Sequence, residues 1–254
     1  MNKIPLHGFN NLTKSLSFSL YKLHYLDNSK IQRNYNSYIN QHFCADNLTE
    51  LLVTVCHAIG GNILNIAKQD YQPQGASVTL MISEEAQPKS IPRLKMESIV
   101  AHLDKSHLCI HSYPEEAPQA NIAIFRADIE LSTCGVISPL KILNYVIKEF
   151  NADVVDIDYR VRGMTRDRHG KKHYIDEQIE KISDSLDSTI VDGYIINNQN
   201  LPEQNLFHCK LGKKEILLKD YLFECEEDIL SSLEQNEIET KLEQEIQQLF
   251  KNSA

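Results

Sequence analysis

The chain has 254 residues, 42% of them hydrophobic, which is enough apolar material for a domain that folds without disulfide bonds. Its formal net charge of −9 argues against a nucleic acid or an anionic membrane as main partner, and no apolar run approaches the roughly 20 residues of a membrane helix. Six scattered cysteines, without a C-x-x-C pair or a signal peptide, indicate a reducing compartment and predict a cytoplasmic protein.

The first helix is predicted in the segment NLTELLVTVCHAIGG. Asn47 and Glu50 have the spacing of a capping box, apolar residues recur at helical intervals, and Gly60 and Gly61 end the pattern. The first 45 residues of the chain show no comparable signal, and we expect them to form a peripheral extension.

Three β-strands are predicted next, at residues 75–83, 106–113 and 122–135, where β-branched and apolar residues lie between turn-forming segments. Short connections favour antiparallel pairing of these strands. A fourth strand is predicted at residues 152–163, and the polar segment that follows it is expected to form a turn.

Helices are predicted in the remaining segments with helical periodicity. Ser138 and Pro139 suit the N-cap and the first position of a helix that reaches Phe150. Residues 176–186 are typical of another helix, and the C-terminal end of the chain predicts an acidic amphipathic helix. The order of elements predicts a single α+β domain over residues 1–254, a two-layer sandwich of an antiparallel sheet covered by helices.

The segment HLDKSHLCIHSYPEE is the most informative part of the chain. Leu108 and Ile110 supply the apolar face of a strand, so the polar face formed by His107, Cys109 and His111 needs a separate explanation. The simplest explanation is a strand whose second face is exposed to solvent, where each of these residues is common.

Two chemical interpretations of this segment are weak. A metal site would use His102, His107, Cys109 and His111, but the last three span about 13 Å along a strand, too far to share one tetrahedral ion. A serine or cysteine hydrolase would need an activated nucleophile at a tight turn, and the residues around Ser106 contain no G-x-S-x-G elbow.

A third interpretation depends on a resemblance. The segment KMESIVAHLDKSHLCIHSYPE, followed by FRADIELSTCGVISPLKILNY and IDYRVRGMTRD, resembles the bacterial S-adenosylmethionine decarboxylase family in its longer proteobacterial form. The combination of S-H-x-x-x-H-x-x-P-E with a later T-C-G before a helix is highly specific. The resemblance implies a pyruvoyl-dependent decarboxylase that converts S-adenosylmethionine to the aminopropyl donor for spermidine synthesis and releases CO2.

The resemblance also implies that the enzyme makes its own cofactor. Ser106 matches the family serine whose hydroxyl attacks the preceding carbonyl, so the bond between Lys105 and Ser106 would be cut. A pyruvoyl group would then remain at the new N-terminus. The products would be a β chain, residues 1–105, and an α chain, residues 106–254.

Two further residues match family groups that take part in this processing. His111 matches the base that removes the α-proton of the esterified serine, and Ser98 matches a second serine that assists the cut. Ser106 and His111 are five residues apart, so an alternating strand places them on opposite faces. A bend or turn at Ser106 is therefore expected to bring them together.

The remaining roles implied by the resemblance concern catalysis. The pyruvoyl carbonyl condenses with the amine of the substrate and accepts the electron pair left by CO2. Cys134 matches the family's proton donor, because a thiol that carries its proton can act as an acid. Glu115 matches the acidic residue of the family's P-E pair and is a candidate to bind ribose hydroxyls. Tyr113 is a candidate for a cation–π contact with the sulfonium.

The longer subgroup implies a dependence on magnesium and a heterooctamer of four α and four β chains. The sequence offers no acidic cluster that places the ion. Residues 160–172 hold six Lys or Arg, but in an acidic protein such a run is more often a solvated hairpin than an RNA site. Two alternatives remain open: a catalytically inactive regulatory relative, and a pyruvoyl decarboxylase of another amino acid.

Overall fold

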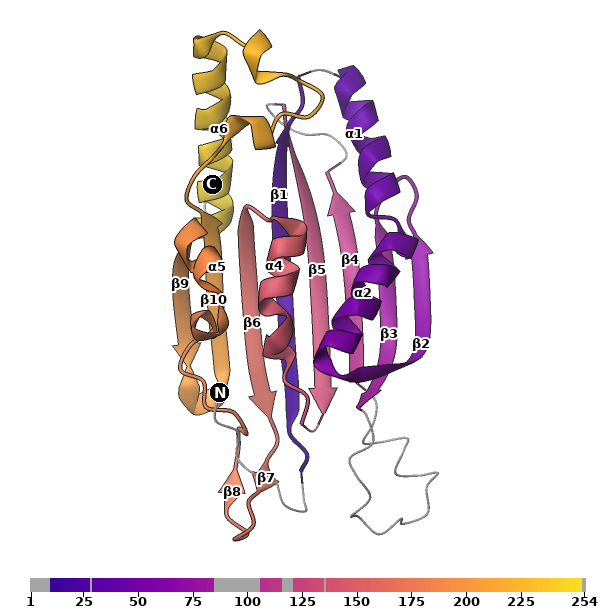
Figure 1. The fold of residues 1–254 in the computed structure, drawn as a ribbon, viewed down its shortest axis with the longest axis vertical. Coiled ribbons are helices and arrows are strands. Elements are labelled where there is room, and N and C mark those ends of the chain that lie inside the picture. The colour runs from indigo at the N-terminus through magenta and orange to yellow at the C-terminus, as the bar shows by residue number, and fades with distance from the viewer. Residues whose placement is uncertain (1–9, 28, 85–105, 116–120, 135, 253–254) are drawn as a thin grey trace.

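An eight-stranded antiparallel sheet with strand order β2-β3-β4-β5-β1-β6-β10-β9 forms the centre of the molecule (Figure 1). The computed structural model describes residues 10–27, 29–84, 106–115, 121–134 and 136–252. The strands of the sheet are β1 (Thr13–Tyr25), β2 (Gly61–Asp70), β3 (Ala76–Glu84), β4 (Ser106–Pro114), β5 (Ile122–Cys134), β6 (Val154–Arg162), β9 (Tyr194–Leu201) and β10 (Leu206–Lys213). A separate hairpin consists of β7 (Thr165–Arg166) and β8 (Lys172–His173).

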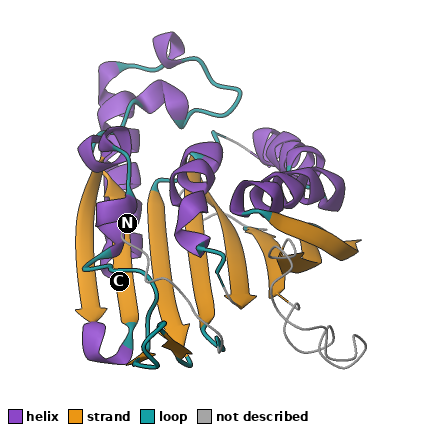
Figure 2. Cartoon of the chain, turned by 60° about the horizontal axis from the view of Figure 1, so that its bottom comes forward, coloured by secondary structure: helices purple, strands orange, loops and turns teal. Residues whose placement is uncertain are grey.

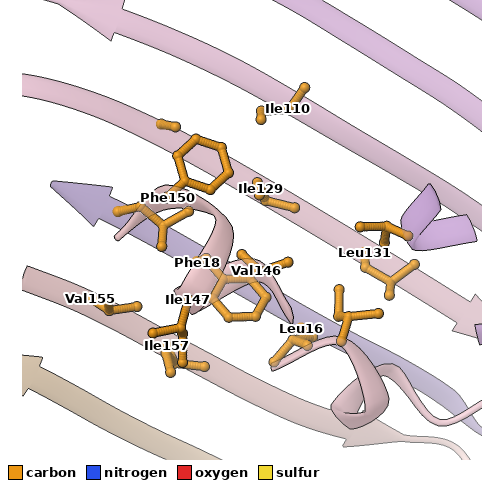
Figure 3. Packing of buried hydrophobic residues seen from close by; sticks show 14 of the residues in the cluster. Leu16, Phe18, Ile110, Ile129, Leu131, Val146, Ile147, Phe150, Val155 and Ile157 are labelled. Carbon is orange, nitrogen blue, oxygen red and sulfur yellow. The ribbon is translucent and has the colours of Figure 1, made fainter. Parts of the chain in front are cut away.

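Helices cover one face of this sheet (Figures 1 and 2). They are α1 (Ser29–His42), α2 (Ala45–Ile59) and α4 (Leu143–Phe150), with the short α5 (Ser188–Gly193) at the β9 edge. Figure 3 shows the contact between α4 and the sheet, where Val146 and Ile147 lie over Phe18 and Ile157. Each fully buried side chain of this size contributes about 1.5–3 kcal/mol. The predicted α+β sandwich of an antiparallel sheet covered by helices is confirmed.

The C-terminal helix α6 (Ser232–Lys251) packs on the opposite face at one corner of the sheet. Val154 and Val155 are neighbours on β6 and point to opposite faces, yet both are buried, and only Val154 belongs to the cluster that contains Ile238 and Leu242 of α6. The helix begins with a capping box in which Ser231 and Glu234 bond each other's backbone. The predicted C-terminal amphipathic helix is therefore confirmed.

The expectation that the first 45 residues form a peripheral extension is wrong. β1 lies in the middle of the sheet and pairs with β5 from Thr13 to Tyr25 and with β6 from Thr13 to Tyr21. The physical reason lies in the alternation of the segment KSLSFSL, which places Leu16 and Phe18 under the helices and serines on the other face. The edge strand β2 was also not predicted, because most of its residues are exposed on both faces.

The first predicted helix exists as α2, but Asn47 is not its N-cap. The N-cap is Cys44, three residues earlier, and Asp70 Oδ1 accepts a hydrogen bond from the Ala45 amide at 2.7 Å. The Asn47 side chain instead donates to two carbonyl groups at the end of α1. Gly60 ends the helix in a left-handed conformation with φ 82°, as predicted.

The helix predicted from Ser138 divides into a 3-10 turn, Pro139–Ile142, and α4. Ser138 makes no capping hydrogen bond, because its hydroxyl donates to Glu177 Oε2 at 2.7 Å. The predicted strand at 152–163 is confirmed as β6, and the polar segment after it forms the β7–β8 hairpin.

The helix predicted at residues 176–186 is wrong. Only Ile182–Ser185 forms a 3-10 turn, because Asp176 and Glu177 are buried against polar partners from distant parts of the chain and not aligned along a helix. No helix in the described ranges is long and apolar enough to span a membrane.

Candidate active site

Ser106 is the first residue of β4 and lies at one end of the sheet. Its side chain is buried, with 3% of its surface exposed, and its Oγ accepts a hydrogen bond from the backbone N–H of Cys134 at 3.2 Å. Because His107 pairs with Ser132 on β5, the register places Ser106 across from Thr133. The pairing of β4 with β5 therefore fixes the position of the hydroxyl that the sequence predicts to be the nucleophile.

Cys134 is the last residue of β5 and is half-buried. Its Sγ lies 3.9 Å from the hydroxyl of Thr13, the residue that pairs with it on β1. Ser106 and Cys134 were predicted from two segments of the same resemblance, and the structure brings them into contact through the Cys134 amide. This contact joins a candidate nucleophile and a candidate acid at the same end of the sheet.

His111 does not approach Ser106 within one chain. Residues 106 to 111 of β4 pair with β3 in an unbroken register, without a bulge, so the expected bend does not bring the two side chains together. Five residues of strand separate them by about 17 Å, and they point to opposite faces of the sheet. His111 Nδ1 instead lies 3.4 Å from the Tyr71 hydroxyl.

The two candidate substrate-binding residues lie near His111, at the other end of β4. Tyr113 is 46% exposed, and the Arg126 guanidinium lies 5.4 Å from the centre of its ring. Glu115 Oε2 accepts a hydrogen bond from the Ile124 amide at 3.1 Å, and burial raises the pKa of its carboxyl. Tyr113 is about 23 Å along the strand from Ser106, so one chain does not place it beside the nucleophile.

Ser98 and Lys105 lie outside the described residues. The candidate cleavage site is thus described from Ser106 onward.

A buried ion pair beside Cys134 was missed by the sequence analysis. The ammonium of Lys14, which is fully buried on β1, lies 2.7 Å from Asp176 Oδ2 and donates to the carbonyl of Ile137 at 3.0 Å. The sequence contained one indication of this pair: Lys14 is two residues from Leu16, so on a strand it faces inward like Leu16. The pair ties the segment that follows Cys134 to a distant part of the chain.

One group of side chains on the face opposite α2 and α4 has the composition of a metal site. Asp156, Asp158 and His208 each offer a ligand atom, and these atoms lie within 4.8 Å of one another. Two carboxylates suit magnesium, but an imidazole does not, and the Lys210 ammonium already lies 3.4 Å from Asp156. The cluster therefore fits magnesium poorly, and we assign it no chemical step.

Comparison with known proteins identifies relatives over almost the whole chain. A family model described as S-adenosylmethionine decarboxylase matches residues 40–163. An S-adenosylmethionine decarboxylase proenzyme of Photorhabdus laumondii is 50% identical over 256 residues, which cover 98% of this chain and 97% of that protein. The protein of the same name from Pseudoalteromonas translucida is 49% identical and covers 98% of this chain and 95% of its own length.

A solved structure is also similar to the chain. The adenosylmethionine decarboxylase from Aquifex aeolicus VF5 matches 68% of this chain and 98% of its own, with 15% identity and a TM-score of 0.35. That score is too low to support a conclusion about the site.

Proposed function

The chain belongs to the S-adenosylmethionine decarboxylase family, and from this premise we propose that it is a self-processing, pyruvoyl-dependent enzyme of the cytoplasm that decarboxylates S-adenosylmethionine. Its product would be the aminopropyl donor for spermidine synthesis. The observation that supports this most directly is the buried Ser106 hydroxyl at the start of β4, in contact with the Cys134 amide.

The processing reaction uses groups of the chain and one water molecule. Ser106 Oγ adds to the carbonyl carbon bonded to its own amide nitrogen, and the C–N bond then breaks, which leaves an ester and a free amine. A base removes the α-proton of Ser106, and elimination releases residues 1–105 with a carboxylate end. The resulting dehydroalanine tautomerises to an imine, which water hydrolyses to a pyruvoyl group and ammonia.

The pyruvoyl group supplies an electron sink for the electron pair that CO2 leaves behind. Cys134 then acts as the acid that returns a proton to the former α-carbon of the substrate. Its position at the end of β5, next to the start of β4, supports this role because the pyruvoyl group replaces Ser106. Ser98 is proposed to assist the cut, and magnesium is proposed as a requirement of the enzyme without an assigned site.

We propose further that the chain functions as an assembly of four α and four β chains, in which His111 serves the Ser106 of a second copy. His111 pairs with Asp128 of β5. Asp128 and Cys134 are an even number of residues apart on that strand, so the side chains of His111 and Cys134 lie on the same face of the sheet. Two copies whose β4 strands cross in opposite directions on this face would each place His111 toward the Cα of the other's Ser106, where the α-proton is removed, while the Ser106 side chain points to the opposite face. Tyr113 would then reach the partner's substrate from the same end of the strand.

Glu115 is proposed to bind the ribose hydroxyls in this arrangement. Burial raises the pKa of its carboxyl, and the Ile124 amide holds one of its oxygens. The other oxygen is the one proposed to accept a ribose hydroxyl.

Intact mass spectrometry of the denatured protein tests self-processing. We expect two chains, residues 1–105 and 106–254, the second lighter than its serine form by the elements of ammonia. Ser106→Ala should remain one chain and release no CO2 from carboxyl-labelled S-adenosylmethionine. Ser112→Ala is a matched control, since Ser112 is also buried on the same face of β4, and it should still be cut. An uncut wild-type chain would contradict the proposal and favour an inactive relative.

Mixed assemblies test the role of a second copy. Ser106→Ala and His111→Ala chains are produced together with different affinity tags, and each is also produced alone. If His111 acts between copies, the His111→Ala chain is cut only in the mixture. A His111→Ala chain that is cut when produced alone, or that stays uncut in a purified mixed assembly, contradicts this arrangement.

A further inference from the structure

Thr133 is a buried residue beside the proposed nucleophile whose hydroxyl has no hydrogen-bond partner. It lies on β5 between Ser106 of β4 and Lys14 of β1, in a row of three side chains on the helix-covered face of the sheet. Its side chain is 0% exposed, and Oγ1 makes no hydrogen bond among the described residues. Buried hydroxyl groups are normally paired, so this one requires an explanation.

The polar groups next to Thr133 are directed elsewhere. The Lys14 ammonium bonds Asp176 and the carbonyl of Ile137, and Ser106 Oγ accepts its hydrogen bond from the Cys134 amide. Valine would fill the same volume without an unpaired hydroxyl, and it would also favour the strand. A structural role alone therefore gives no reason for threonine, because its unpaired hydroxyl lowers the stability of the fold.

We propose that Thr133 is a catalytic residue of the processing reaction, and this inference rests on the proposed function. Its hydroxyl donates a hydrogen bond to the oxyanion that forms when Ser106 Oγ adds to the carbonyl carbon bonded to the Ser106 nitrogen. In that addition the new C–O bond forms and the carbonyl electrons move to oxygen. When the C–N bond breaks, the oxyanion electrons re-form the carbonyl, and the nitrogen takes the proton that the Ser106 hydroxyl gave up. Thr133 keeps its own proton throughout.

The register of the strands supports this division of roles. Side chains directly across an antiparallel pair have Cβ atoms about 4.5–5.5 Å apart, so the Thr133 hydroxyl lies beside the reacting serine and on the same face. The Cys134 side chain points to the opposite face, and its backbone N–H is already bonded to Ser106 Oγ. Cys134 thus orients the nucleophile through its amide, and Thr133 is the neighbouring donor available for the charge that develops.

The test compares Thr133→Val with Thr133→Ser in cell-free synthesis, where the fraction of cut chain is followed over time on denaturing gels. Removing one preorganised donor to an oxyanion typically slows a reaction about 100- to 1,000-fold, so Thr133→Val should be cut at least about 100-fold more slowly than wild type. Thr133→Ser keeps the hydroxyl and should be cut within a few-fold of the wild-type rate.

A stability measurement separates catalysis from misfolding. Thr133→Val is also placed in the uncut Ser106→Ala chain, and its melting temperature should equal or exceed that of Ser106→Ala alone, since no hydrogen bond is lost. Cutting of Thr133→Val at the wild-type rate would overturn the role of Thr133 while the proposed function stands. Slow cutting with a lowered melting temperature, or an equal defect in Thr133→Ser, would also overturn it. An uncut wild-type chain would refute both proposals.

Discussion

The backbone N–H of Cys134 donates a hydrogen bond of 3.2 Å to Ser106 Oγ across a separation of 28 residues in the chain. The contact uses the Cys134 backbone, whereas the thiol projects to the other face of the sheet beside Thr13. One residue can therefore take part in two steps through different atoms. Replacing its side chain should separate these steps.

Cys134→Ala should process normally and lose turnover. The backbone N–H that contacts Ser106 is retained, but the thiol proposed to protonate the substrate carbon is removed, and general acids contribute about 10²–10⁴-fold. Release of CO2 from S-adenosylmethionine measures the loss. Mass spectrometry should detect α chains in which a misplaced proton and the substrate's nitrogen have converted the pyruvoyl end to alanine. Cys109→Ala is the matched control, since Cys109 is a half-buried cysteine of β4; equal losses in both variants would remove Cys134 from the mechanism.

Lys14→Met should destabilise the precursor strongly. Lys14 and Asp176 are 0% and 2% exposed, so removing the ammonium leaves a buried carboxylate without its partner, which costs about 3–5 kcal/mol. Urea denaturation of the uncut Ser106→Ala chain measures the change. The exposed pair of Lys148 with Asp187 provides a comparison, and Lys148→Met should cost less than about 1 kcal/mol. Similar losses of unfolding free energy in both variants would show that burial does not strengthen the contribution of the Lys14–Asp176 pair.

Gly163→Ala should be more destabilising than Gly170→Ala. Both glycines have positive φ, 87° and 79°, but a Cβ on Gly163 would lie 2.3 Å from the Asn11 carbonyl oxygen, while a Cβ on Gly170 meets nothing within 4 Å. Gly170→Ala therefore loses about 1–2 kcal/mol from backbone strain alone. Gly163→Ala adds a clash with backbone and should exceed that value. The urea midpoints of the two variants give the comparison, and equal midpoints would contradict the prediction.

The stability of the precursor should fall on acidification partly because of His24. Burial, reinforced by Lys22, lowers the pKa of His24 to about 3 from 6.5. The folded chain keeps this ring neutral, while the unfolded chain takes up a proton below about pH 6.5. The contribution of His24 to the free energy of unfolding is therefore complete above about pH 6.5 and decreases toward pH 3. One proton corresponds to a slope of at most about 1.4 kcal/mol per pH unit. His24→Phe in the Ser106→Ala chain should show a shallower dependence of unfolding free energy on pH; an unchanged slope would exclude His24 as a source.

The sequence predicts the fold best where a strand or helix shows clear periodicity and turn residues at its ends. β4 and β5 met both conditions, and their predicted bounds lie within a residue or two of the observed ones. β1 was missed although its serines and apolar residues alternate, because Lys14 occupies an inward position and polar residues surround the short apolar pattern. Its place in the centre of the sheet depends on pairing with residues more than a hundred positions away, as the contact of Thr13 with Cys134 illustrates.

The candidate site was predictable in its residue types but only partly in its geometry. The motif identified Ser106 and Cys134, which the structure brings into contact. Strand parity alone indicated that His111 faces away from Ser106, and the unbroken register of β4 maintains that separation. Thr133 was not selected, because an unpaired hydroxyl is a property of the packed sheet and not of the sequence motif.

The central position of β1 determines how the two fragments would behave after the proposed cut before Ser106. β1 belongs to the first fragment, yet it lies between β5 and β6 of the second fragment and pairs with both. β3 of the first fragment also pairs with β4 of the second, so neither fragment could leave without breaking three ladders of hydrogen bonds, and scission would leave an interlocked pair. The kinetic order of refolding, however, should differ between the uncut and the cut protein. The uncut chain refolds as one molecule, whereas the proposed processed enzyme would have to reassemble from two chains, and its recovery should depend on protein concentration.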